Sequence, residues 1–113
     1  MLQNVAGGVE RYMNLLSARQ KLVAANIANV DTPGYKTKDI DFQTELANQL
    51  AGVDPQAVEV SGLKTKNDGN NVDMDRESRL LAENALRFAV ATNLARSELQ
   101  TLKTAIEEGG KSS

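Results

Sequence analysis

The spacing of apolar residues at the two ends of the chain is the feature that most restricts its fold. In this 113-residue sequence, apolar side chains recur at alternating intervals of four and three residues over 5–30 and again over 75–108. That spacing places them on one face of an α-helix, the face that packs against another helix. The sequence therefore predicts two long helices, and either Asp73 or Asp75 is expected to cap the second. Glu77 is expected to favour the first turn of that helix through the helix dipole.

The two predicted helices carry matching apolar faces. The face of the first contains Val9, Met13, Leu16, Val23 and Ile27, and the face of the second contains Leu81, Phe88, Leu99, Leu102 and Ile106. Because a polar middle segment joins the helices, we expect these faces to pair within the chain as an antiparallel coiled-coil hairpin. The predicted fold class is mainly α, with a single domain over 1–113 and a short irregular or small-β middle.

A hairpin of two helices leaves apolar surface uncovered, because it buries only one stripe on each helix. A second set of leucines flanks the main faces and is expected to stay exposed in an isolated chain: Leu15, Leu22, Leu80, Leu86 and Leu94. The chain has no Trp and few other aromatic residues, so its own core is thin for its length. We therefore expect weak or partial folding of the isolated chain, and further ordering when sister chains cover these side chains.

The middle segment, 31–74, is predicted to hold a turn, a short helix and a loop. The short helix follows from apolar residues spaced by four: Phe42, Leu46 and Leu50. Asp39 or Asp41 is expected to cap it. Residues 57–60 then alternate in polarity before an Asn-Asp-Gly-Asn-Asn stretch, a pattern that allows either a small β-hairpin or a mobile loop.

The composition removes most kinds of chemistry. The chain contains no His and no Cys, so it cannot form Ser-His or Cys-His catalytic pairs or the common zinc sites. It has no glycine-rich phosphate-binding loop, and the acidic residues near Gly69 do not have EF-hand spacing. The net charge of −2, with both signs interspersed, gives no basic patch for nucleic acid. We expect no enzyme activity, no cofactor or metal, no small-molecule substrate and no nucleic-acid partner.

The sequence also predicts no direct insertion into a membrane. No apolar run approaches the length of about 20 residues that a membrane-spanning helix needs. The first residues lack the basic and continuous apolar regions of a cleavable signal peptide. If the protein leaves the cytoplasm, we expect a route that needs no such signal.

The stretch "ANIANVDTPGYK", 25–36, combines two asparagines at helical spacing with a Pro-Gly turn. Pro33 and Gly34 suit the two central positions of a type II turn. Asparagine is common at helix ends, which accounts for Asn29. Asn26 is unusual, because a helix interior disfavours Asn unless its amide finds a partner. An amide beside an apolar face can fix register and partner, so we expect both asparagines to hold the helix end and the turn against adjacent chains. The predicted subunit-interaction and turn motif is Asn26, Ile27, Asn29, Thr32, Pro33, Gly34 and Tyr35.

Three stretches of the sequence resemble the bacterial flagellar axial proteins. "ANIANVDTPGYK" resembles the N-terminal signature shared by rod, hook and hook-associated subunits. "KTKDIDFQTEL" (36–46) and "NNVDMDRESRLLAEN" (70–84) resemble two stretches of the proximal rod subunits. The chain is therefore similar to the flagellar basal-body rod protein family, in particular to its proximal members.

That resemblance implies a structural subunit of the proximal rod that is required for motility. Its terminal helices would pair as a coiled coil and assemble head-to-tail with copies of itself and other rod subunits, so that the rod transmits motor torque. The family implies a location in the basal body on the periplasmic side, reached through the flagellar type III export apparatus without a cleaved signal peptide. Further partners implied are that apparatus and the adaptor proteins between membrane ring and rod.

One function of a different class fits the same residues: a soluble helical adaptor or export chaperone that offers a groove to a partner protein. Such a protein would form a stable, discrete dimer in solution. A rod subunit would be a loosely folded monomer that polymerises at high concentration. Sedimentation at several concentrations separates the two functions.

Overall fold

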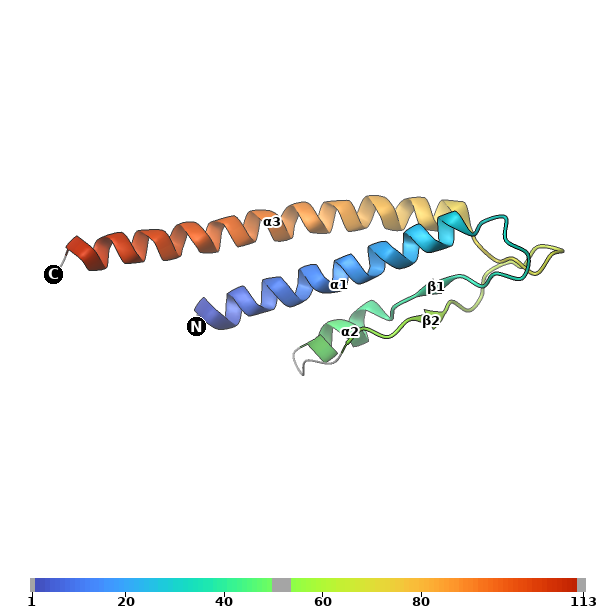
Figure 1. The fold of residues 1–113 in the computed structure, drawn as a ribbon, viewed down its shortest axis with the longest axis horizontal. Coiled ribbons are helices and arrows are strands. Elements are labelled where there is room, and N and C mark those ends of the chain that lie inside the picture. Colours follow the sequence, from blue (N-terminus) through green and yellow to red (C-terminus); the bar gives the residue numbers. More distant parts are fainter. Residues whose placement is uncertain (1, 50–53, 112–113) are drawn as a thin grey trace.

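Two long helices packed antiparallel dominate the computed structural model, which describes residues 2–49 and 54–111 (Figure 1). The first helix, α1, runs over Leu2–Ala28, and the last, α3, runs over Met74–Lys111. The molecule is elongated, with extents of 72 × 25 × 17 Å. The predicted mainly α class, with terminal helices that pair along the chain, is confirmed.

The helices differ in length, and this difference shapes the molecule. α1 has 27 residues and α3 has 38, so α3 continues well beyond the N-terminus of α1 (Figure 1). The sequence predicted an end before Gly109, yet α3 passes through Gly109 and Gly110 to Lys111. Glycine lowers helix propensity without excluding the helical backbone, and therefore does not have to end a helix.

The middle of the chain folds back along α1. It contains a short strand β1 (Lys38–Asp39), a helix α2 (Phe42–Gln49) and a short strand β2 (Val58–Glu59). β1 and β2 pair antiparallel, with Lys38 opposite Glu59. β2 thus pairs with β1, the strand that precedes α2 in the sequence. α1 lies between α3 and this middle segment, so the fold has three layers (Figure 1).

Aspartates cap α2 and α3. The Oδ1 atom of Asp73 accepts hydrogen bonds from the backbone N–H groups of Asp75 (3.0 Å) and Arg76 (3.3 Å) at the start of α3. Asp41 precedes α2 and accepts from the N–H of Thr44 at 3.4 Å. These side chains satisfy N–H groups that lack partners within the first turn of a helix. Leu50, the last of the apolar residues expected in the short helix, lies outside the described residues.

The hydrophobic core sits on the side of α1 that faces the middle segment. It consists of the buried side chains Leu15, Leu16, Ile40 and Phe42, with Tyr12, Leu22 and Phe88 packed against them. The expectation that Leu15 stays exposed is wrong, because the middle segment covers it. Leu86 and Leu94 are exposed as expected, while Leu22 and Leu80 are half-buried.

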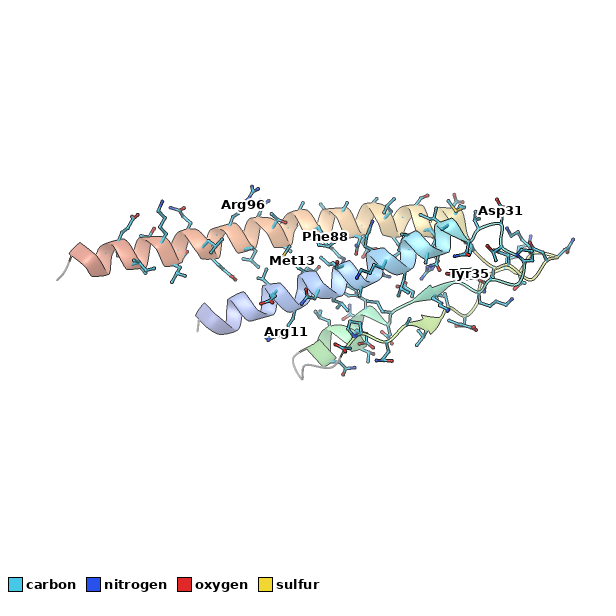
Figure 2. The ribbon with its side chains drawn as sticks, viewed as in Figure 1. Arg11, Met13, Asp31, Tyr35, Phe88 and Arg96 are labelled. Atoms are coloured by element: carbon cyan, nitrogen blue, oxygen red, sulfur yellow. The ribbon has the colours of Figure 1, made fainter. Side chains whose placement is uncertain are left out.

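The predicted pairing of apolar faces forms only in part. On α1, Val9, Leu16 and Val23 are buried, and Met13 and Ile27 are half-buried. Of the five predicted residues on α3, Phe88 is half-buried, and the other four are exposed and need correction: Leu81, Leu99, Leu102 and Ile106. The last three lie where α3 extends past α1. Figure 2 shows Met13 and Phe88 between the two helices and Arg96 pointing away from α1.

Candidate functional site

The side chain of Asn26 is the centre of a polar site where α1 ends. Its Nδ2 atom donates to the backbone oxygen of Lys38 at 2.8 Å and to Oε1 of Glu77. Its Oδ1 atom accepts from the Tyr35 hydroxyl at 2.9 Å and from the Lys38 N–H at 3.1 Å. The amide therefore makes all four hydrogen bonds available to it, and it is completely buried. These bonds tie α1, β1 and α3 to one another.

Charged side chains surround this amide. Arg19 donates from Nε and Nη2 to the two carboxylate oxygens of Asp39, at 3.1 and 3.0 Å. Arg76 donates to Asp39 at 2.6 Å and to both oxygens of Glu77 at 3.1 Å. We call the following residues the polar cluster: Arg19, Asn26, Tyr35, Asp39, Arg76 and Glu77. Its two buried carboxylates are paired with guanidinium groups, as buried charges must be.

Burial changes the titration of two members of the polar cluster. Loss of water raises the pKa of Glu77 above its ordinary value of 4.5, an effect that the Asn26 hydrogen bond and the Arg76 charge oppose and that the Asp39 charge reinforces. Burial also raises the pKa of the Tyr35 hydroxyl, and the negative charge of Glu77 adds to that shift. The native fold thus takes up a proton at Glu77 more readily than the unfolded chain does.

This raised pKa predicts a pH dependence of stability. Between the ordinary pKa and the raised one, the native state binds more protons at Glu77 than the unfolded state, so stability falls as pH rises through this window. Below the ordinary value the contribution is fully present. We expect the difference in free energy of unfolding between the native chain and Glu77→Gln to change with pH across this window and to level off outside it. Chemical denaturation at a series of pH values measures it, and a difference that does not vary with pH contradicts it.

Two further asparagines hold the loop after β2, one against the end of α1 and the other against the residue before β1. Asn70 donates from Nδ2 to the backbone oxygens of Asn29 at 2.8 Å and Thr32 at 2.9 Å. Asn71 accepts from the N–H of Thr37 through its side chain at 2.6 Å, and from the Thr37 hydroxyl through its backbone oxygen at 3.2 Å. The two stretches "ANIANVDTPGYK" and "NNVDMDRESRLLAEN" therefore meet at one end of the molecule.

Two glycines permit the closest approach in this junction. Gly34 has φ +76°, and the N–H of Tyr35 bonds to the oxygen of Thr32 at 3.2 Å, which is the geometry of a type II turn. Gly69 has φ +87°, and a Cβ placed there would lie 3.3 Å from Cα of Gly34. The Gly34 N–H bonds to the backbone oxygen of Asp68 at 2.9 Å, so the two turns are in direct contact.

This contact predicts a difference between two glycine substitutions. Gly62 also has positive φ (+80°), but a Cβ there would meet nothing within 4 Å. Gly62→Ala should lower the free energy of unfolding by about 1–2 kcal/mol through backbone strain alone. Gly69→Ala should lower it further, because the added methyl group meets the backbone of the turn. Urea denaturation compares the two variants. Equal decreases in the free energy of unfolding would show that a methyl group at position 69 does not clash with the turn at Gly34.

The predicted interaction motif divides into an inner and an outer part. Asn26 is buried and Ile27, Asn29 and Tyr35 are half-buried, whereas Thr32, Pro33 and Gly34 are exposed. All four hydrogen bonds of the Asn26 side chain go to groups of the same chain. Asn26 therefore holds the turn against the chain's own middle segment. Figure 2 shows Tyr35 and Asp31 at this end of the molecule.

Sequence reasoning missed several members of this site. The sequence gives no role to Arg19 or Arg76 and predicts only a helix cap at Asp39. It indicates Asn70 and Asn71 only as loop residues or as part of a resemblance. The signal for Glu77 was its resemblance to a rod signature, but its burial depends on three segments that meet only in the folded chain. An asparagine in a helix interior was the one usable sign of a buried polar site.

Over 2–49 and 54–111, no group of three His, Cys, Asp or Glu side chains is arranged to hold a metal ion. No helix in the described part of the chain is long and apolar enough to cross a membrane. The guanidinium–carboxylate pairs connect structural elements, and all atoms of Asp39 and Glu77 that could act as a base are occupied by donors.

The other distinctive surface is the exposed part of α3, on more than one side of the helix. Large apolar side chains stand out along its whole length: Met74, Leu81, Leu86, Val90, Leu94, Leu99, Leu102 and Ile106. Leu99 is 67% exposed. An apolar surface of this extent on a small protein marks a site of association.

Comparison with known proteins identifies the family of this chain. A model of the family described as "Flagella basal body rod protein" matches residues 12–36. The flagellar basal body rod protein FlgB of Salmonella typhimurium is 32% identical, over 86% of this chain and 88% of its own length. FlgB of Borrelia hermsii is 31% identical over 86% and 91% of the two chains, and FlgB of Escherichia coli K12 is 30% identical over 86% and 88%. The chain therefore belongs to the FlgB family of flagellar basal body rod proteins.

Proposed function

We propose that the chain is a structural subunit of the bacterial flagellar rod, which assembles with sister chains and transmits motor torque through packed helices. The observation that carries this proposal is the set of exposed apolar side chains along α3. Hydrogen bonds at the end where α1 stops hold the remaining elements together. Torque transmission needs stiff, laterally packed helices. It needs no catalytic group, and we propose that the protein is not an enzyme.

The stiffness of the subunit would come from the polar cluster. Arg19 and Arg76 both bind Asp39, so α1 and α3 are joined to β1 by ion pairs as well as by apolar packing. Such a site resists sliding of one helix along the other, because any shift would leave buried charges unpaired. The exposed apolar residues would then be presented to neighbouring subunits in a fixed geometry.

The route and the partners extend this proposal. We propose that the subunit is exported through the flagellar type III apparatus without a cleaved signal peptide and takes its place on the periplasmic side of the basal body. There it would contact other rod subunits and the adaptor proteins at the membrane ring. The exposed tip, Thr32 and Pro33, is available for such contacts. The adaptor or chaperone function is not favoured, because the relatives are named as rod proteins.

Complementation tests the proposed function. In a strain that lacks the gene, the native chain should restore rods and swimming. A frame-preserving deletion of the last turns of α3, 98–111, should restore neither, although the shortened protein is still made and retains the polar cluster. Isolated basal bodies examined by electron microscopy give the readout. A strain that swims with the shortened chain, or one that the native chain cannot rescue, would contradict the proposal.

A further inference from the structure

Six of the eight exposed large apolar residues of α3 form two separate patches. The overhang patch consists of Leu99, Leu102 and Ile106, and the outer patch consists of Leu86, Val90 and Leu94. All six side chains are exposed, and each patch extends over about two turns of the helix.

The overhang patch continues the side of α3 that faces α1. Asn84 on that side donates to the backbone oxygen of Leu16 at 3.0 Å, and Ala91 is buried against α1. Steps of three and four residues lead from Ala91 to the overhang patch. Arg87 donates to the hydroxyl of Tyr12 at 3.0 Å, which fixes the register. In this antiparallel pair α1 therefore begins about level with residue 97, so it cannot cover Leu102 or Ile106.

The outer patch lies on the opposite side of the same helix. Its three residues are four apart, and at about 100° per residue they point roughly half a turn away from Phe88, which packs toward α1. Neither α1 nor the middle segment reaches this side, because α1 lies between α3 and that segment (Figure 1).

The two patches match in length, and two residues of each match in spacing. Leu102 follows Val90 by twelve residues, and Ile106 follows Leu94 by the same interval. Resting on the proposed function, we propose that the overhang patch of one copy packs against the outer patch of a second copy. The two α3 helices then run parallel with a shift of about twelve residues, or roughly 18 Å at 1.5 Å per residue.

Charge favours the same arrangement. Residues 98–110 carry Glu98, Glu107 and Glu108 against Lys103, with Lys111 following, whereas residues 79–96 carry Arg79, Arg87 and Arg96 against Glu83. With the helices parallel and shifted by about twelve residues, Glu98 comes within one residue of the level of Arg87, and Glu107 within one residue of the level of Arg96. Glu98 and Arg87 lie on the same edge of the contact, whereas Glu107 and Arg96 share the other edge but point further from it, by more than about 100° from the centres of the two patches. The acidic end of one helix therefore meets the basic stretch of the next.

The contact does not close on itself. Each copy carries one patch of each kind on opposite sides of α3, so a bound pair still presents one free patch at either end. Copies therefore add in one direction and form an open chain, as a helical rod requires. Three side chains from each copy make a small interface, so we expect a single pair to be weak and a run of neighbours to hold together.

Cysteine crosslinking tests this pairing, because the chain contains no cysteine of its own. Val90→Cys and Leu102→Cys are prepared as separate proteins, and circular dichroism verifies that both fold as the native chain does. A short bis-maleimide is added to each alone and to their mixture at high protein concentration. We expect a crosslinked dimer in the mixture and little or none in either protein alone. A chain that carries both substitutions should give a ladder of longer products.

A matched control uses Gln100→Cys, which is exposed on α3 but lies about 120° around the helix from the overhang patch. Mixed with Val90→Cys, it should crosslink at least tenfold less. Strong 90–90 or 102–102 crosslinks in the single proteins, or no 90–102 product in the mixture, would overturn the proposed pairing. Those results leave the proposed function intact, because the complementation experiment with the native and shortened chains tests that function separately.

Discussion

Replacing Asn26 with leucine is expected to lower the free energy of unfolding by about 3–5 kcal/mol. Leucine has the same branched arrangement of side-chain heavy atoms, but its side chain has no polar atom. Its introduction leaves the Tyr35 hydroxyl, both backbone groups of Lys38 and one oxygen of Glu77 short of a partner inside the protein. A domain of this size is stable by only about 5–15 kcal/mol, so a loss of this magnitude is severe. Urea denaturation followed by circular dichroism measures it.

Two matched variants show whether the loss comes from the buried amide. Asn29→Ala removes bonds to Ala25 and Thr32 at a half-exposed position and should lower stability by only about 1 kcal/mol. Asn26→Asp keeps the oxygen but places a second carboxylate against Glu77, so its deficit should shrink as pH falls and the carboxyl groups become protonated. If Asn26→Leu were no worse than Asn29→Ala, the polar cluster would not hold the fold.

Replacing Leu99 with aspartate is expected to abolish rod assembly and swimming while the isolated chain remains folded. Leu99 is 67% exposed, and a surface substitution of this kind changes the free energy of unfolding by about 0.5 kcal/mol or less. The charge would instead lie in the contact between subunits, where an unpaired buried charge is strongly unfavourable. Swimming in soft agar and electron microscopy of basal bodies give the functional readout, and urea denaturation gives the folding control.

Gln100→Asp is the matched substitution for Leu99→Asp. It introduces the same charge one residue further along α3, at an exposed position on a different side of the helix. It should leave both swimming and stability close to those of the native chain. A Leu99→Asp strain that swims normally would show that the overhang of α3 is not an assembly surface.

The long helices could be predicted from sequence because their apolar residues repeat with the helical period. The same pattern could not give the register. Leu102 and Ile106 continue the apolar face of α3, but the face of α1 ends before it reaches them, and only the folded structure shows how far the shorter helix extends. Periodicity identifies which side of a helix is apolar. It does not identify which chain covers that side.

Leu15 and Glu77 show why burial was harder to predict. Leu15 belonged to a flanking stripe with no visible partner, and it is buried because the middle segment returns along α1 and brings Ile40 and Phe42 onto it. Glu77 suited the first turn of a helix, but its burial depends on Asn26 and Arg76 arriving from different parts of the fold. Contacts between segments distant in sequence leave little trace in local spacing.

Asn26 lies between these cases. A helix-interior asparagine predicted that its amide would have a specific partner, and the structure supplies four hydrogen bonds. These partners belong to the same chain, whereas the sequence alone predicts partners on an adjacent chain. An amide requires hydrogen bonds wherever it is buried, and this requirement is the same whether they come from within a chain or across an interface.

Amide hydrogen exchange along α3 tests most directly whether the end of this helix is built to be covered by a sister chain. In dilute solution, the amides of 98–111 should exchange rapidly while those near Asn26 and Glu77 remain protected. When the protein is concentrated enough to associate, the amides of 98–111 should gain protection. If they are already as well protected in the dilute monomer as those of the polar cluster, and do not change with concentration, the helix end needs no neighbour and the account is wrong.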